Sequence, residues 1–234
     1  MSDSGKSKIK WAPLEGNPEV FNQFYKELGG SESFEFVDVW GLEEDLLNFI
    51  PQPVKAVIFL FPVSKTYEKF RLEEDKSLEG KESENNSKVF FMKQTVGNAC
   101  GTVAFLHGLI NNSETLELKS DILNKFIKDC EDLNSLERGN RLGEDSELAH
   151  IHSNIAQQGQ TESMDPDSIL DLHFLCFVEK DGEIYELDGR KRSAVNHGKC
   201  DELLRASVKV IKQFISRDSS QVNFSVVALT AKQS

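Results

Sequence analysis

Residues 89–110 read VFFMKQTVGNACGTVAFLHGLI, and this stretch decides how the rest of the chain is expected to fold. It opens with four apolar residues, which predict a short strand, and then passes through a polar turn. From Val103 to Ile110 the apolar residues recur at helical spacing, which predicts a helix. Asn98 is expected to cap that helix, so that Cys100 lies in its first turn.

A cysteine at the start of a helix is a candidate nucleophile. Unpaired N–H groups and the positive end of the helix dipole favour the thiolate, which is the form of cysteine that attacks. Gln94 lies across the predicted turn from Cys100, and its amide could donate to an oxyanion, an arrangement that suits acyl transfer. A lone cysteine in an apolar segment is more often a small buried hydrophobe, so a catalytic role needs further support from the chain.

The composition is that of a soluble protein with an acidic surface. The chain has 234 residues, of which 38% are hydrophobic and 28% charged, and its formal net charge is −12. This charge argues against a nucleic-acid partner and fits either a basic protein partner or a solvated acidic surface. The longest apolar run, Val54–Val63, is far too short to span a bilayer, so no membrane association is expected.

The four cysteines are widely spaced and include no CxxC pair. This pattern fits free thiols in a reducing compartment better than a disulfide framework or a zinc site. The first ten residues are polar and lysine-bearing, which is not the pattern of a signal peptide. The protein is therefore expected in the cytoplasm, with the nucleus as an alternative, and it is expected to need no metal and no cofactor.

The remaining pattern predicts helices packed on a mainly antiparallel sheet, a fold of the α/β (α+β) class that forms a single domain over residues 1–234. Strands are expected at Phe34–Trp40, Val54–Val63, Leu170–Glu179, Glu183–Leu187 and Val222–Leu229. Helices are expected from Pro18 to Gly29 or Gly30, at Leu42–Ile50, Asp121–Leu133 and Leu203–Ile215, and around Leu148 to Ile155. Polar segments are expected to form a partly helical surface excursion, a charged connection and a loop, at Ser64–Ser87, Ser135–Glu144 and Gln157–Ser168.

One of the five histidines is set apart by its predicted place in the sheet. The pair Asp181-Gly182 is a strong two-residue hairpin turn. Pairing of the strands on either side puts His173 opposite Arg190 and makes Asp188 its diagonal neighbour on the same face. A carboxylate there can hold an imidazole in one tautomer and stabilise the imidazolium, which is what a cysteine nucleophile needs. Without that carboxylate, a core histidine bonded to the backbone would be the better interpretation.

The other histidines and cysteines are expected to be structural or to lie at the surface. His107 is on the cysteine helix and is expected to be structural. The histidines in polar surroundings without a carboxylate partner are expected at the surface: His150, His152 and His197. The cysteines that lack both a helix start and a base are expected to be inert: Cys130, Cys176 and Cys200.

Three groups of residues closely resemble the ubiquitin carboxyl-terminal hydrolases, a family of papain-like cysteine deubiquitinases. They are Lys93–Thr102 around the cysteine, Asp171–Phe174 around the histidine and Tyr185–Arg190 around the aspartate. The likeness extends over nearly the whole chain, from Trp11–Val20 to Asn196–Gly198. It is greatest to the short, single-domain members of the isozyme L-three type.

The resemblance implies a role for each of four residues. Cys100 would be the nucleophile, His173 the general base and acid, and Asp188 the residue that orients His173. Gln94 would share the oxyanion hole with the backbone N–H of Cys100. The resemblance also implies a papain-like core with a crossover loop over the active site, at about Ser153–Ser168. Because the substrate's tail must pass under that loop, small or unfolded leaving groups would be favoured.

The resemblance also implies contacts with ubiquitin from the N-terminal segment, the crossover loop and the segment around the start of the last strand. The expected contact residues are Pro13, Leu14, Glu15, Asn17, Pro18, Ala156, Gly159, Gln160, Thr161, Glu162, Ser163, Gln221, Val222, Phe224 and Val226.

These residues predict a cysteine-dependent deubiquitinase that hydrolyses the thioester, ester, amide or peptide bond after the C-terminal glycine of ubiquitin. Two alternatives stay open: a non-catalytic ubiquitin-binding module with the same fold, and a hydrolase that acts mainly on a close ubiquitin-like modifier. Ubiquitin is the expected partner, neither nucleic acid nor membrane is expected to bind, and a monomer is expected.

Overall fold

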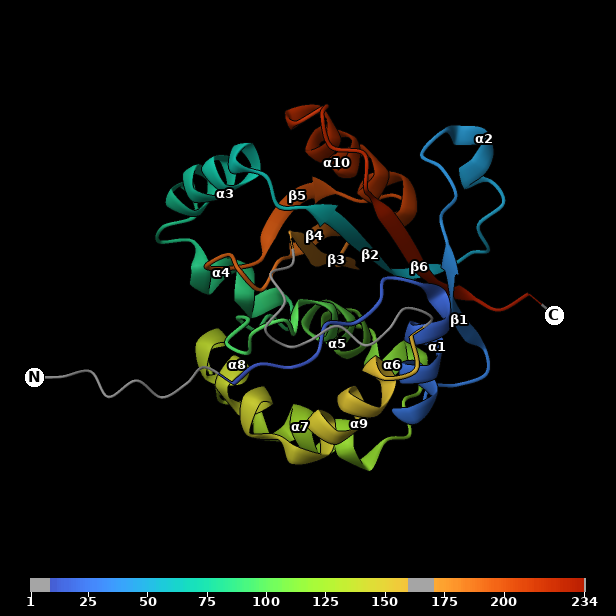
Figure 1. Ribbon diagram of the computed structural model, residues 1–234, viewed down its shortest axis with the longest axis vertical. Helices are drawn as coiled ribbons and strands as arrows, with labels where there is room; N and C mark the ends of the chain where they lie inside the picture. The colour runs from blue at the N-terminus through green and yellow to red at the C-terminus, as the bar shows by residue number, and fades with distance from the viewer. Residues whose placement is uncertain (1–8, 160–170, 234) are drawn as a thin grey trace, which may run out of the picture.

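A six-stranded sheet organises the computed structural model, which describes residues 9–159 and 171–233 (Figure 1). The strands run in the order β1-β6-β2-β3-β4-β5, and each pairs antiparallel with its neighbours. The strands are β1 (Phe34–Asp38), β2 (Val54–Pro62), β3 (Leu172–Lys180), β4 (Glu183–Leu187), β5 (Val195–Lys199) and β6 (Ser225–Ala231). The described helices are α1 (Pro18–Glu27), α2 (Glu44–Leu47), α3 (Lys65–Ser77), α4 (Glu82–Lys88), α5 (Cys100–Asn111), α6 (Ser113–Leu116), α7 (Asp121–Asp129), α8 (Ser135–Glu144), α9 (Ser146–Ala156) and α10 (Leu203–Arg217).

Helices cover both faces of the sheet, as the sequence predicts. Figure 1 shows α5 on one face, with α1 and α6 to α9 beyond it, and α10 on the other face. Strand β2 faces both layers, since Ala56 and Ile58 join the core on the α5 side while Val57 and Phe59 join the core on the α10 side. This explains its nearly continuous apolar run, which is typical of a strand covered on both faces.

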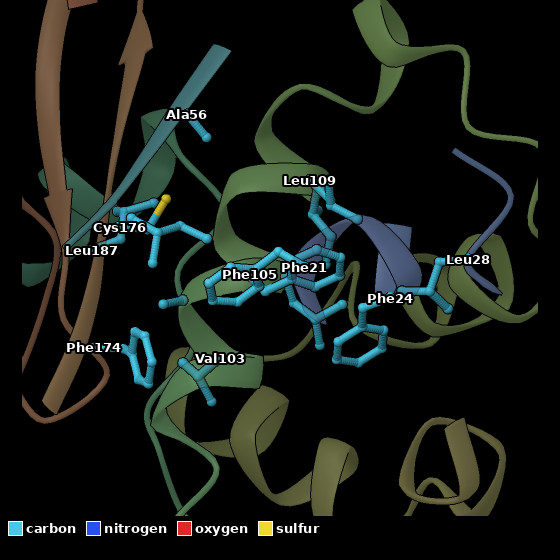
Figure 2. Packing of buried hydrophobic residues seen from close by; sticks show 14 of the residues in the cluster. Phe21, Phe24, Leu28, Ala56, Val103, Phe105, Leu109, Phe174, Cys176 and Leu187 are labelled. Atoms are coloured by element: carbon cyan, nitrogen blue, oxygen red, sulfur yellow. The ribbon is translucent and has the colours of Figure 1, made fainter. Parts of the chain in front are cut away.

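Helix α5 is enclosed on all sides. Every residue from Gly101 to Ile110 is buried. The ring of Phe105 stacks on Phe24 of α1 with a centroid separation of 4.5 Å and on Phe21 at 5.8 Å. Figure 2 shows these rings together, with side chains of β3 on the sheet side of α5. The first residue of α5, Cys100, is therefore held on a rigid support.

Ser64–Ser87, predicted as a partly helical surface excursion, is helical over most of its length. Ser135–Glu144, predicted as a charged connection, is a helix, so that prediction was wrong. Residues 64–87 contain α3 and α4, and Ser135–Glu144 forms α8. The side chain of Ser64 caps α3, and α8 begins with a capping box between Asn134 and Glu137. Both caps are visible in the sequence, but the charged composition that follows them favours a loop.

The four apolar residues that precede the cysteine turn do not form a strand, contrary to the prediction. The N–H of Phe90 donates to Asn111 Oδ1 at 2.7 Å, and its carbonyl accepts from Asn111 Nδ2 at 2.9 Å. The N–H of Met92 donates to His107 Nε2 at 3.0 Å. Side chains of α5 therefore satisfy the backbone groups that a neighbouring strand would otherwise satisfy.

The predicted hairpin is present, while other predicted elements differ in their bounds. Asp181 and Gly182 have φ angles of 54° and 76°, as a type I′ turn requires. The helix predicted over Leu42–Ile50 is limited to the four residues of α2. Strand β5 is missing from the prediction because its polar sequence, VNHGK, lacks an apolar alternation.

His152 is buried and connects three parts of the chain, so its predicted place at the surface was wrong. Its Nδ1 lies 2.7 Å from Thr102 Oγ1 of α5, and its Nε2 lies 2.8 Å from the carbonyl oxygen of Ala12. Its ring packs against Trp11 with a centroid separation of 4.6 Å. Burial lowers the pKa of His152 to about 4, although the hydrogen bond to Ala12 opposes this shift.

We expect the protein to lose stability as the pH falls from 6.5 to about 4, because His152 binds a proton in the unfolded chain that it excludes when folded. In His152→Gln, the loss of unfolding free energy between pH 7 and pH 5 should be smaller than in the wild type by about 2 kcal/mol. Chemical denaturation at the two pH values measures this difference. His150→Gln, which alters an exposed histidine of the same helix, is the matched control. Equal losses in wild type and His152→Gln would contradict the assignment.

Candidate active site

Cys100 is the first residue of α5 and is half-buried. The N-cap is Ala99 rather than Asn98, so the predicted cap was wrong. Asn98 has a φ of 59°, a left-handed conformation that asparagine tolerates better than most residues and that differs from the extended N-cap conformation. Because no side chain among the described residues caps this helix, the positive end of the helix dipole acts mainly on the sulfur of Cys100.

His173 and Asp188 meet beside this helix start. Nε2 of His173 lies 2.6 Å from Oδ1 of Asp188, and both side chains are buried. His173 also lies close enough to Cys100 for its imidazole to act on the thiol. Because Nε2 faces the carboxylate, Nδ1 is the ring nitrogen left for the thiol. The structure thus brings together the three residues that the sequence singles out.

The strand register that led to this pair is only partly as predicted. Lys180 pairs with Glu183, but the ladder between β3 and β4 ends where Cys176 pairs with Leu187. His173 therefore lies beyond the ladder and is not opposite Arg190. Its strand partner is Phe61 of β2, whose ring lies edge-on to the imidazole with a centroid separation of 5.7 Å.

The electrostatic interactions of the three residues favour an ion pair. Burial disfavours the imidazolium, but the charge and hydrogen bond of Asp188, together with Cys100, raise the pKa of His173 to about 9. Burial opposes the thiolate, but the hydrogen bond and charge of His173 hold the pKa of Cys100 below its ordinary value. Burial also opposes ionisation of Asp188, yet the positive charge of His173 lowers its pKa. All three shifts favour thiolate, imidazolium and carboxylate.

Tyr67 is a site residue that the sequence analysis missed. Its hydroxyl donates to Oδ2 of Asp188 at 2.7 Å, while the backbone N–H of Arg190 donates to Oδ1 at 2.9 Å. Both carboxylate oxygens of Asp188 therefore accept hydrogen bonds, and Oδ1 also faces His173. Tyr67 lies in the segment expected to be a surface excursion, and its spacing gives no signal that it reaches Asp188.

One face of α3 holds the segment that carries Asp188. Glu68 pairs with the Arg190 guanidinium at 2.7 Å, and Asp75 accepts the backbone N–H of Arg192 at 2.9 Å. Lys191 is buried between Glu74 and Glu186, and it pairs with both. His197 lies 2.9 Å from the other oxygen of Glu186, so its predicted lack of a carboxylate partner was wrong. These contacts fix the turn after β4 against α3.

Gln94 lies between the cysteine turn and the segment of Asp188. Its backbone N–H donates to the carbonyl of Gly189 at 2.8 Å. A Cβ atom at position 189 would lie 3.0 Å from Gln94 Cβ, so the close approach needs glycine. The Gln94 amide Nε2 donates to the carbonyl of Val96 at 3.2 Å, and its Oε1 is buried with no hydrogen-bond partner among the described residues. The amide is thus held in the turn that leads to Cys100.

The expected contact residues of the N-terminal segment lie close to this site. Leu14 is buried against Gly101, the second residue of α5. The side chain of Glu15 lies against Gly159, which belongs to the predicted crossover loop and directly precedes the residues that the structure does not describe. Asn17 caps α1 and Pro18 begins it, so these two also have structural roles. Pro13 is half-buried beside them.

The remaining expected contacts fall in different environments. Val222 is 80% exposed, and Gln221 lies in the turn before it. Phe224 and Val226 border a hollow of about 320 Å³, although Val226 itself is buried. Ala156 ends α9. The expected contacts outside the described residues are Gln160, Thr161, Glu162 and Ser163.

The other thiols lack the environment of Cys100. All four cysteines are free. Burial raises the pKa of Cys130 to about 11, and burial also raises the pKa of Cys176 and Cys200. His107 on α5 is buried, and burial lowers its pKa to about 4.

The described residues hold neither a metal-ligand cluster nor a membrane-spanning helix. Within residues 9–159 and 171–233, no group of three or more His, Cys, Asp or Glu is arranged to hold a metal ion. In the same residues, no helix combines the length and the apolarity needed to cross a membrane.

Comparison with known proteins points to one family. The profile of ubiquitin carboxyl-terminal hydrolase family 1 matches residues 11–216. A ubiquitin carboxyl-terminal hydrolase of Drosophila melanogaster is 41% identical over 96% of this chain and 99% of its own length. Isozyme L1 of Rattus norvegicus is 38% identical over 93% of this chain and 96% of its own length. The UCH37 catalytic domain of Trichinella spiralis, solved bound to ubiquitin vinyl methyl ester, is 22% identical with a TM-score of 0.75, and the match covers 95% of this chain and 96% of that one.

We expect Cys100 to react with iodoacetamide at neutral pH before the other three thiols, because only its pKa is lowered. In His173→Gln the reaction at pH 7 should be slower, because the group that lowers the pKa of Cys100 is lost and the thiolate fraction falls. Mass spectrometry after timed alkylation gives the rate at each position. Identical pH profiles in the wild type and His173→Gln would show that the imidazole does not activate the sulfur.

We expect Tyr67→Phe to lower the unfolding free energy by about 1.5–3 kcal/mol, because it removes a hydrogen bond to a buried carboxylate. Alkylation of Cys100 at pH 7 should also slow, since Asp188 then holds His173 less firmly. Tyr185→Phe is the matched control, because its hydroxyl bonds to Glu183 at 2.9 Å, away from the site. If both variants alkylate at the wild-type rate, Tyr67 serves stability alone.

Proposed function

The chain belongs to family 1 of the ubiquitin carboxyl-terminal hydrolases, and we propose that it hydrolyses the bond after the C-terminal glycine of ubiquitin through Cys100. The protein is a thiol-dependent deubiquitinase with ubiquitin as its partner. The observation that carries the assignment of Cys100 is its position at the start of α5 beside His173, whose Nε2 lies 2.6 Å from Asp188. A sulfur, a base and an orienting carboxylate in this order suit acyl transfer.

The proposed reaction begins with the thiolate of Cys100. Its sulfur forms a bond to the carbonyl carbon of the terminal glycine, and the carbonyl electron pair moves onto oxygen. The backbone N–H of Cys100 and the side-chain amide of Gln94 donate hydrogen bonds to this oxyanion. To do so, the Gln94 amide gives up its hydrogen bond to the Val96 carbonyl or shares its N–H groups between the two oxygens. When the oxyanion collapses, the bond to the leaving amine breaks and His173 gives that amine its proton.

Hydrolysis of the resulting thioester completes the cycle. Neutral His173 removes a proton from water, whose oxygen attacks the same carbonyl carbon. Ubiquitin leaves with a free carboxylate, and the sulfur of Cys100 departs as the thiolate. Throughout, Asp188 keeps Nε2 of His173 protonated, so that Nδ1 is the nitrogen that exchanges protons with the reacting groups.

We propose that ubiquitin contacts the protein along the N-terminal segment and at the hollow beside β6. Leu14 and Glu15 lie near the start of α5, where the tail of ubiquitin must enter. The hollow is bordered by Phe224 and by Trp40, which is 84% exposed. Exposed aromatic rings are common anchors in protein interfaces, and this supports the hollow as a second contact.

The preference for small or unfolded leaving groups is a proposal from the family resemblance, since residues 160–168 of the loop expected to impose it lie outside the described residues. Action on a close ubiquitin-like modifier is the second candidate activity. The greater likeness to the isozyme L-three type stays a prediction. We further propose a monomer that acts in the cytoplasm or the nucleus, where reduced thiols such as these four persist.

The direct test is turnover of a ubiquitin carboxyl-terminal thioester or amide. Wild type should hydrolyse it, and Cys100→Ser should not. A ubiquitin derivative with a C-terminal electrophile should label Cys100 and separate an enzyme from a non-catalytic binding module. Binding of ubiquitin with neither turnover nor labelling would contradict the proposal. Competition between ubiquitin and a ubiquitin-like substrate distinguishes the two candidate activities.

We expect Gln94→Ala to lower kcat by about 10²–10³, because it removes a donor that stabilises the transition state, while KM changes little. Steady-state kinetics with a ubiquitin amide measure both constants. Gln23→Ala, on α1, is the control. Normal turnover by Gln94→Ala would show that another group binds the oxyanion.

A further inference from the structure

A polar hollow of about 880 Å³ opens beside the active site. It is formed by the end of α3, helix α4, the start of α8 and the segments around Lys93 and Arg190. Figure 1 shows α3, α4 and α8 at one end of the molecule and α1, β1 and β6 at the other. The hollow therefore lies away from the hollow at β6 where ubiquitin is proposed to bind. We call it the α4–α8 cleft.

Two segments that line the α4–α8 cleft continue directly into the active site. Lys93 directly precedes Gln94, and Arg190 follows Asp188 by two residues. Gln94 and Gly189 are hydrogen-bonded backbone to backbone at 2.8 Å, so the two segments meet at the edge of the site. An extended peptide advances about 3.3 Å per residue, and a chain that leaves the reacting carbonyl could reach this cleft within a few residues.

The charges that line the α4–α8 cleft do not cancel. Arg192 pairs with Glu82 at 3.1 Å, and Arg190 pairs with Glu68 at 2.7 Å. Asp75 accepts from Arg71 and from the backbone N–H of Arg192. The acidic groups of the lining are thus already bound to cations.

Among the described residues, two cations of the α4–α8 cleft have no carboxylate partner. Arg138 donates to the carbonyls of Cys130 and Phe91 and lies over the ring of Phe90, but it pairs with no acid among the described residues. Lys93 is half-buried, and its Nζ has neither a hydrogen bond nor an ion pair within residues 9–159 and 171–233. On a chain of net charge −12, this is a locally positive concavity.

We propose that the α4–α8 cleft receives the leaving-group side of the substrate and favours a peptide with acidic side chains just after the scissile bond. This inference rests on the proposed function and adds the chemistry of the group that leaves. The volume is within the range of ligand sites, and the polar lining, which includes Asn86, Asn134 and Ser135, suits an extended peptide. Carboxylates of that peptide would pair with Lys93 and Arg138.

The test uses ubiquitin fused at its C-terminus to short unstructured peptides. One peptide carries Asp and Glu at its second to fourth positions, and a matched peptide carries Asn and Gln. Wild type should cleave the acidic fusion about three- to tenfold faster in kcat/KM at low salt, because partly exposed ion pairs contribute modestly. That ratio should fall toward one as salt is added. A ratio of one at low salt would overturn the inference.

Reversing the charge at position 93 tests whether Lys93 causes the preference for the acidic peptide. In Lys93→Glu the ratio of acidic to neutral kcat/KM should fall below one, and in Lys93→Gln it should lie between the wild-type value and one. The ratio is measured within each variant, so a general loss of activity cancels. Lys128→Glu, an exposed lysine on α7, should keep the wild-type ratio. An unchanged ratio in Lys93→Glu would also overturn the inference.

Failure of this inference is distinguishable from failure of the proposed function. A ubiquitin thioester with a small uncharged leaving group reports the hydrolysis alone. If wild type cleaves it but shows no preference between the two fusions, only the leaving-group assignment is wrong. If wild type cleaves no ubiquitin derivative at all, the proposed function itself is wrong.

Discussion

The hydrogen bond between Nε2 of His173 and Oδ1 of Asp188 joins two groups that have both been removed from water. A buried carboxylate is unfavourable unless charge and hydrogen bonds compensate it. Here the imidazolium, the N–H of Arg190 and the hydroxyl of Tyr67 together supply that compensation. Because each of these groups comes from a different segment, the ionised carboxylate stabilises the packing of those segments. The same charge favours the proton on the ring that faces Cys100.

The catalytic side chains come from separate elements of the fold. Helix α5 is fixed between α1 and the sheet, which sets the position of Cys100. Strand β3 sets the position of His173, and the end of β4 leads directly to Asp188. Helix α3 then holds the segment 188–192 through several ion pairs and hydrogen bonds. Arg190 and Arg192 of that same segment line the cleft proposed for the leaving group.

Much of this arrangement follows from the sequence, and the exceptions have physical causes. The meeting of His173 and Asp188 was predictable because the Asp181-Gly182 turn sets the pairing of β3 with β4, which brings the end of β4 toward the start of β3, although the ladder ends before His173. Tyr67 was not predictable, since a contact between a helix and a distant loop leaves no periodic signal. His152 was assigned to the surface because its sequence neighbours are polar, yet the ring finds its partners in α5 and the N-terminal segment. Local composition indicates exposure only where tertiary contacts do not override it.

The central claim is that the free protein holds His173 as an imidazolium beside the sulfur of Cys100. Nitrogen NMR of the imidazole, assigned by comparison with His173→Gln, tests this most directly. We predict that both ring nitrogens of His173 are protonated at pH 7 and that the ring loses a proton near pH 9. A neutral ring at pH 7, with a single protonated nitrogen, would contradict the account.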